Sequence, residues 1–410
     1  MRDLSNDPGG CPEPNVSGST DVRNLANQPP VIRFVNLLIR DAHDAAASDI
    51  HLEATQVGLR VRFRIDGVLS ELPSPPATLQ AAVVSRIKLL AELDIAERRQ
   101  PQDGRIRVRL ESRELDLRVS TVPTLHGESV VLRLLARGGC PISLDELGMP
   151  AGMLETFEQL ARKPHGIVLA TGPTGSGKTT TLYAALGLRR VTEEKVITVE
   201  DPVEYHLEGV TQVPVHQRAG VTFATALRSI LRQDPDVLMV GEMRDTETAA
   251  IAVQSAMTGH LVLSTLHTND AAGALTRLVD LRIEPYMVAA TLEAVLAQRL
   301  VRRICQECRE LYRPDPAVVS LLCRRPVGAI ELARGRGCVA CRHTGFRGRM
   351  GIFELLVMTE DLKLLLATGG GLATLRSRVR GDEFQTLRDD AWAKVQAGLT
   401  TVEEVLRVLE

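Results

Sequence analysis

The chain has 410 residues, 44% of them hydrophobic, which is enough for two domains with ordinary cores. Its formal net charge of −2 and its 3% aromatic residues argue against a generic nucleic-acid binder, which needs positive charge and stacking rings. No apolar run is long enough to span a bilayer and no signal peptide is visible, so we expect a cytoplasmic protein whose membrane contact runs only through partners.

The first predicted domain is an α+β domain over residues 31–137, after a tail over 1–30 that is rich in Pro, Gly, Asn and Ser. Apolar and charged residues alternate over 58–67, 105–110 and 114–120, which predicts an antiparallel sheet with an arginine-rich face. Helical periodicity from Val31 and over 77–93 places helices on the other face. Most of these arginines are expected to be solvated, and the alternative is that a few reach a phosphate.

The second predicted domain covers residues 151–410, after a linker over 138–150. Short apolar strands alternate there with helical stretches, which is typical of βαβ units and a parallel sheet. The expected strands are 166–171, 195–199, 236–241 and 260–265.

A phosphate-binding loop follows the first of these strands. The segment fits G-x-x-x-x-G-K-[ST], with a buried strand before it and a helix after it, as this loop requires. Its glycines allow successive N–H groups to face phosphate oxygens, its lysine reaches the outer phosphates, and its threonine holds magnesium. We therefore expect ATP and Mg²⁺ to be bound by Gly172, Pro173, Thr174, Gly175, Ser176, Gly177, Lys178, Thr179 and Thr180.

Two further strands end in carboxylates. Glu200 and Glu204 follow the strand at 195–199, at the edge where α/β sheets bind ligands, and either can orient or deprotonate an attacking water. A solvated acidic turn is the alternative for this segment. Glu242 ends the strand at 236–241 and resembles a Walker B acid that reaches magnesium.

Histidines and arginines complete the candidate catalytic set. His260 and His267 bracket the strand at 260–265, where they either contact phosphate or have a structural role. Arg228 and Arg232 are four residues apart, which places them on one face of a predicted helix.

Four cysteines form two C-x-x-C pairs within residues 304–346. Four thiolates at this spacing are the ligands of a tetrahedral structural Zn²⁺ site, and they leave no open position for a catalytic water. The predicted ligands are Cys305, Cys308, Cys338 and Cys341, with Cys323 and His343 as bystanders.

Together these motifs closely resemble the ATPases of type II secretion and type IV pilus assembly. The resemblance runs from residue 31 to the C-terminus and is carried by the phosphate loop, the tetracysteine and these segments: Ser48–Glu53, Pro101–Arg105, Leu117–Pro123, 197–204, 236–245 and Thr258–His267.

The resemblance implies a RecA-like motor domain with a parallel-sheet core, a smaller PAS-like α+β domain that closes over the nucleotide, and an inserted zinc subdomain. It implies a homo-hexameric, magnesium-dependent ATPase, peripheral at the inner membrane through platform proteins. It assigns the general base to Glu204, the Walker B acid to Glu242, the histidine motif to His260 and His267, and phosphate-reaching arginines to Arg105 and Arg118.

Pilus-retraction relatives generally lack the tetracysteine, and the run Leu296–Arg302 is more similar to the secretion branch. That branch usually carries a further N-terminal recruitment domain, whereas only about thirty residues precede the core here. We therefore expect either another docking surface or a short-form paralogue.

The leading hypothesis is an ATPase motor of type II secretion that assembles a pilus-like filament for protein export. The alternatives are a type IV pilus extension ATPase, a nucleic-acid motor built on the same core, and a nucleotide-binding scaffold whose hydrolysis is incidental.

Overall fold

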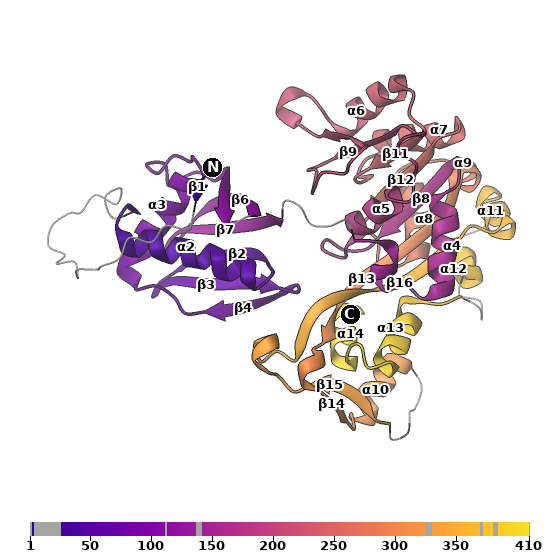
Figure 1. Ribbon diagram of the computed structural model, residues 1–410. Helices are drawn as coiled ribbons and strands as arrows, with labels where there is room; N and C mark the ends of the chain where they lie inside the picture. The colour runs from indigo at the N-terminus through magenta and orange to yellow at the C-terminus, as the bar shows by residue number, and fades with distance from the viewer. Residues whose placement is uncertain are drawn as a thin grey trace. The chain divides into compact units, whose positions relative to one another are not determined.

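A computed structural model describes residues 2–3, 26–110, 113–136, 142–324, 328, 330–369, 372–379 and 384–409. The chain divides into two compact units, Met1–Gly139 and Cys140–Glu410 (Figure 1). Most of the predicted tail lies outside the described residues. Across the described ranges, no helix is both long and apolar enough to cross a bilayer.

In the described part of the N-terminal unit, helices α2 and α3 pack on one face of a seven-stranded sheet. The strand order is β1-β5-β6-β7-β2-β3-β4, and every neighbouring pair is antiparallel except β1 and β5. The elements are β1 (Arg2–Asp3), α2 (Pro29–Asp44), β2 (Ala47–Thr55), β3 (Gly58–Ile65), β4 (Val68–Leu72), α3 (Gln80–Leu90), β5 (Gln102–Leu110), β6 (Arg113–Thr124) and β7 (Gly127–Ala136).

Alternation along the strands separates the two faces of this sheet. Leu59, Val61 and Phe63 of β3 are buried and belong to the same core as the inner faces of α2 and α3. The arginines between them lie on the opposite face, as the period of two requires. The predicted α+β domain with one helical face and one arginine-rich face is therefore confirmed.

The C-terminal unit is built on a second seven-stranded sheet, in the order β10-β9-β11-β12-β8-β13-β16. All neighbours are parallel except β13 and β16, which are antiparallel. Its strands are β8 (Gly166–Thr171), β9 (Val196–Glu200), β10 (Thr211–Pro214), β11 (Val237–Val240), β12 (Leu261–Leu266), β13 (Leu292–Ile304) and β16 (Phe346–Val357).

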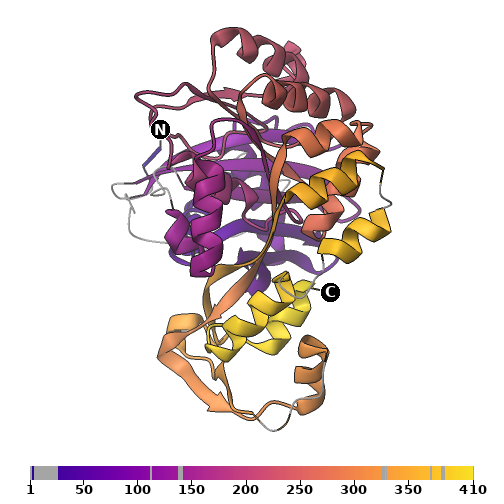
Figure 2. The same ribbon diagram turned by 90° about the vertical axis from the view of Figure 1, so that its right-hand side faces the viewer.

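Helices cover both faces of this sheet because the central strands are apolar on both sides. Val168 and Ala170 pack in one core, with α4 and α5, while Ile167 and Leu169 pack in another, with α6–α9. The two layers of helices can be followed in Figure 2, magenta on one side of the strands and orange on the other. The helices are α4 (Ala151–Ala161), α5 (Lys178–Leu186), α6 (Phe223–Ile230), α7 (Thr246–Met257), α8 (Ala271–Asp280) and α9 (Pro285–Thr291).

The long strands β13 and β16 extend beyond the sheet and frame the cysteine-rich insertion, where β14 (Arg309–Tyr312) pairs with β15 (Leu332–Gly335). The chain then ends in helices. These are α11 (Glu360–Ala367), α12 (Leu372–Val379), α13 (Leu387–Gln396) and α14 (Val402–Leu409), and α10 (Pro316–Cys323) lies within the insertion. The predicted inserted subdomain is thus the connection between two paired strands.

The predicted linker is more ordered than its composition indicates. Within its described part, Leu144–Leu147 forms a 3-10 helix closed by a capping box between Ser143 and Glu146. Residues 137–141 lie outside the described ranges.

Candidate functional site

The phosphate loop connects β8 to α5, as predicted. Gly175 and Gly177 have φ values of 79° and 87°, which non-glycine residues rarely adopt. A side chain at Gly172 is excluded, because a Cβ there would lie 2.5 Å from the carbonyl oxygen of Gln298. Pro173 and Thr174 are exposed, so the crest of the loop is open to a ligand.

Lys178 begins α5 and points back over the loop. Its Nζ donates to the carbonyl oxygens of Gly172 at 2.7 Å and Pro173 at 3.0 Å. Burial lowers the pKa of Lys178 to about 8, against the opposing influence of the Glu242 carboxylate. Glu242 therefore lies near enough to Lys178 to favour its charged form.

Glu242 follows β11, the second strand from β8, at the same carboxyl edge of the sheet. Its carboxylate accepts from Nε of Arg244 at 2.7 Å and lies 3.2 Å from Nε2 of His267, which follows β12. The structure thus brings Lys178, Glu242 and His267 to one edge.

Glu200 and Glu204 have different surroundings although they are close in sequence. Glu200 is buried, and it accepts hydrogen bonds from the Tyr183 hydroxyl, from the Thr198 hydroxyl at 2.5 Å and from the Gln212 amide at 3.2 Å. A carboxylate with these donors is committed to holding α5 against β9 and β10. Glu204 is exposed in the turn that follows and therefore has access to water.

His260 lies away from this edge. Its carbonyl accepts from Gly166 N at the start of β8, and its Nδ1 lies 2.8 Å from the carbonyl oxygen of Ser255. His260 and His267 flank the six residues of β12 and are therefore seven residue steps apart, which at about 3.3 Å per residue is about 23 Å. Within one chain, His260 therefore lies at the end of β12 opposite to the carboxyl edge that carries the phosphate loop, and its predicted role stays a prediction.

The helix expected to carry both Arg228 and Arg232 is shorter than predicted, since α6 ends at Ile230 and a 3-10 helix follows. Arg228 forms an ion pair with Glu247, and Arg232 Nη1 donates to the carbonyl oxygen of Arg228 at 2.7 Å. Both arginines are exposed, so their guanidinium groups remain accessible.

Arg105 and Arg118 belong to the N-terminal unit, where they are register partners on β5 and β6. Arg105 is exposed and Arg118 is half-buried, both on the face away from the helices. Arg105 and Arg118 thus lie on neighbouring strands on the polar face of the sheet, and their role at a phosphate stays a prediction.

Two residues at the phosphate loop, Gln298 and Arg299, were missed as site residues in the sequence. Both lie on β13, whose run Leu296–Arg302 served above only to favour a branch of the family. Gln298 Nε2 donates to the carbonyl oxygen of Ser176 at 2.6 Å. Arg299 is buried beside the loop, and burial lowers its pKa. The available signal was the Gln-Arg pair that interrupts the apolar run Ala294–Val301 of this strand.

The four predicted metal ligands meet in space. Their sulfur atoms all lie within 4.8 Å of one another, and measured separations are 3.9 Å for Cys305–Cys338, 3.8 Å for Cys308–Cys341 and 3.7 Å for Cys338–Cys341. Four sulfurs at about 2.3 Å from a tetrahedral metal are about 3.8 Å apart, and a disulfide would need about 2 Å. The cluster therefore fits a tetrahedral metal ion.

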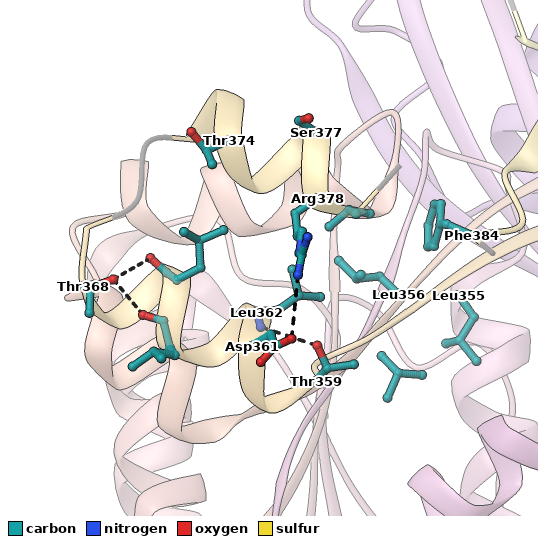
Figure 3. Close-up of a pocket in the computed structure, with 14 residues that line it drawn as sticks. Leu355, Leu356, Thr359, Asp361, Leu362, Thr368, Thr374, Ser377, Arg378 and Phe384 are labelled. Carbon is teal, nitrogen blue, oxygen red and sulfur yellow. Dashed lines mark hydrogen bonds and ion pairs between the residues drawn. The ribbon is translucent and has the colours of Figure 1, made fainter. Parts of the chain in front are cut away.

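A cavity of about 1220 Å³ lies elsewhere in the C-terminal unit, between β16, α11 and α12 (Figure 3). Leu362 and Leu365 line it, and an ion pair of 3.9 Å between Asp361 and Arg378 crosses its rim. None of the predicted site residues lines this cavity, so it adds nothing to the nucleotide chemistry.

Comparisons with known proteins agree with this geometry. A sequence profile of the family described as "Type II/IV secretion system protein" matches residues 24–407. Type II secretion system protein E of Xanthomonas campestris pv. campestris is 51% identical over 401 residues, which is 96% of this chain and 70% of that protein. Type II secretion system ATPase E of Vibrio cholerae serotype O1 is 48% identical over 388 residues, which is 95% of this chain and 77% of that protein. Among solved structures, the pilus retraction motor PilT with bound ADP is similar, with a TM-score of 0.61 at 26% identity, over 90% of this chain and 95% of PilT.

Proposed function

This chain belongs to the type II/IV secretion system protein family, and from that premise we propose that it is the ATP-hydrolysing motor of a type II secretion system. One observation carries the proposal: the buried Lys178 of the phosphate loop, which follows β8, and Glu242, which follows β11, lie at the same carboxyl edge of the parallel sheet. That is the minimum charge arrangement for binding a triphosphate with its metal.

The phosphate loop binds ATP through its backbone amides and Lys178. The carbonyl oxygens of Gly172 and Pro173 accept hydrogen bonds from the Lys178 ammonium, so nucleotide phosphates would compete with them for this group. Thr179 and Glu242 are the residues that would hold Mg²⁺, because they supply a hydroxyl and a carboxylate oxygen, the hard ligands this ion prefers. When bound, Mg²⁺ neutralises charge that develops on the phosphates.

Glu204 is the general base in this proposal. It is exposed in the turn after β9, whereas the carboxylate of Glu200 is buried under three hydrogen-bond donors. A water that attacks the γ-phosphate must lose a proton, and an ionised carboxylate within reach can take it. His267 lies 3.2 Å from Glu242 and orients that carboxylate.

Arginines complete the charge balance of the transition state. Lys178 alone offers one positive charge to the transferred phosphoryl group, and further cations raise the rate by orders of magnitude. Arg105, Arg118, Arg228 and Arg232 are the candidates. An equimolar mixture of Arg105→Ala and Lys178→Ala subunits regains activity if Arg105 serves a neighbouring subunit, and stays inactive if it serves its own.

Zn²⁺ is the proposed occupant of the four-cysteine site, in a structural role. Gly337 N donates to Cys308 Sγ at 3.3 Å, and Gly345 N donates to Cys341 Sγ at 3.3 Å, which are bonds that stabilise thiolates. The ion would close the connection between β13 and β16 and fold it locally.

The proposed assembly is a homo-hexamer at the cytoplasmic face of the inner membrane, bound to platform proteins of the secretion machine, with no nucleic acid as partner. Support comes from the names of the relatives, which are secretion system proteins.

The test is ATP turnover by the purified chain over a magnesium titration, with and without single-stranded DNA. We expect hydrolysis that depends on Mg²⁺, is lost in Lys178→Ala and is unchanged by DNA. Normal turnover in Lys178→Ala would remove the loop assignment, and strong stimulation by DNA would favour a nucleic-acid motor.

A further inference from the structure

Gln298 is the one residue of β13 whose side chain bonds both the phosphate loop and the helix that follows it, within the described residues. β13 runs parallel to β8 with Ala297 level with Thr171, so the next residue, Gln298, comes level with Gly172, where the loop begins. Leu296 points into the core shared with α5, and two residues along a strand share a face. The Gln298 side chain therefore points toward the loop and α5, and it is only 1% exposed.

The Gln298 amide bonds in two directions. Its Nε2 donates to the Ser176 carbonyl at 2.6 Å, and its Oε1 accepts from the Thr181 hydroxyl at 2.8 Å. A buried amide whose two ends are both satisfied has one preferred orientation, because any rotation leaves a buried polar group unpaired. The side chain thus fixes the distance between the loop and the first turns of α5.

The bond to Ser176 also determines where a neighbouring N–H group points. The carbonyl of Ser176 and the N–H of Gly177 belong to one planar trans peptide, so they point in opposite directions. Anchoring the carbonyl on Gln298 turns the Gly177 N–H to the other side, away from β13. Inward-facing N–H groups are what a phosphate loop uses to hold phosphate oxygens.

Arg299 holds the backbone of Gln298 in place. Its Nη1 donates to the Gln298 carbonyl at 3.1 Å and its Nη2 to the Asn269 carbonyl at 2.9 Å. The chain from His267 to Asp270 is joined to β8 as well, since Thr268 N donates to the Thr171 hydroxyl at 2.9 Å. Loop, strand and the segment after β12 are therefore connected through Gln298 and Arg299.

We propose that Gln298 is a positioning residue for the phosphate loop, whose side-chain amide holds the Ser176–Gly177 peptide in the orientation that receives nucleotide phosphates. The inference rests on one part of the proposed function, namely that the phosphate loop binds nucleotide. Without the amide, the Ser176–Gly177 peptide is turned away from the phosphate site in a fraction of the chains. The apparent dissociation constant for nucleotide then equals the intrinsic constant divided by the fraction of chains that can still bind. ATP and ADP share the phosphates involved, so both lose affinity equally.

The test compares Gln298→Met with the wild-type full-length chain. Met has a similar length and no amide, so it keeps most of the packing while both hydrogen bonds are lost. We expect the Kd of a fluorescent ADP analogue and the KM for ATP to rise on the order of tenfold, the free-energy scale of one buried hydrogen bond. Turnover at saturating ATP should stay within about twofold, because bound nucleotide itself restores the loop.

Val301→Ala is the matched control, because Val301 is buried on the same strand and belongs to the core away from the loop. Val301→Ala should lower the Tm by about as much as Gln298→Met does, without changing the Kd of the ADP analogue. Gln298→Glu is the second variant: it keeps the acceptor for Thr181 but loses the donor to Ser176, and it should weaken nucleotide binding even if Gln298→Met fails to fold.

The inference would be overturned if Kd were unchanged in both Gln298 variants, or if Kd rose equally in Val301→Ala. The proposed function would still stand in either case, provided that the wild-type chain hydrolyses ATP. A large loss of saturated turnover with unchanged Kd would also overturn it. A wild-type chain that binds no ADP would overturn both together.

Discussion

Affinity for MgADP should fall as pH rises through 8, because nucleotide binds the charged form of Lys178. Burial lowers the pKa of Lys178 to about 8, with Arg299 adding to the shift and Glu242 opposing it. A lysine with a lowered pKa is charged below that pKa and neutral above it. Binding is therefore strongest below pH 8 and weakens as pH increases.

The size of the effect follows from the fraction of chains with a protonated Lys178. With a pKa of about 8, that fraction is about 76% at pH 7.5 and about 9% at pH 9. If only the protonated chains bind, the apparent Kd rises about eightfold over this range.

The assay is titration of a fluorescent ADP analogue at fixed Mg²⁺ and ionic strength between pH 7.5 and 9. Lys178→Arg is the control: a guanidinium stays charged throughout, so its Kd should be weaker overall but independent of pH. A flat profile for the wild type, or the same slope in Lys178→Arg, would refute the assignment of the lowered pKa to the loop lysine.

Three further outcomes are expected. Glu204→Gln should bind ATP with near-normal affinity but hydrolyse it at least a hundredfold more slowly, because an amide cannot take a proton from water. Arg105→Ala should lower turnover at least tenfold with little change in ATP binding, measured as kcat against Kd. The purified chain should carry about one zinc ion per chain by metal analysis, and Cys338→Ser should lose it and expose reactive thiols while nucleotide binding persists.

Each of these has a result that counts against it. If Glu204→Gln turned over ATP at the wild-type rate, another carboxylate would have to be the general base. Glu208 is an exposed neighbour, and the control Glu208→Gln should hydrolyse ATP at the wild-type rate. If Arg109→Ala, also exposed on β5, lost as much activity as Arg105→Ala, the effect would be that of general surface charge. Metal-free protein with folded, unreactive cysteines would end the zinc assignment.

Local sequence patterns were sufficient for much of the site. The phosphate loop is one continuous segment between a strand and a helix, and its backbone conformations follow from its glycines, so Lys178 could be placed from the sequence. The cysteines were predictable because both pairs sit at fixed local spacing and only the closure of β13 on β16 had to bring them together.

Other features depend on tertiary structure. Gln298 is distant in sequence from Ser176 and reaches it only because β13 lies beside β8, a strand order that periodicity does not determine. The burial of Glu200 depends on donors from α5 and β10, so the sequence could not distinguish it from Glu204. His260 differs, because the strand predicted at 260–265 already placed it and His267 at opposite ends of that strand, as the structure does.

Complementation tests whether ATP hydrolysis by this chain drives protein export. A strain whose own copy of this gene is deleted receives either the wild-type chain or Lys178→Ala at equal expression, and exported protein in the medium is measured. The account predicts export with the wild type and none with Lys178→Ala. Export restored by Lys178→Ala would contradict it, because the chain would then act as a scaffold whose hydrolysis is not used.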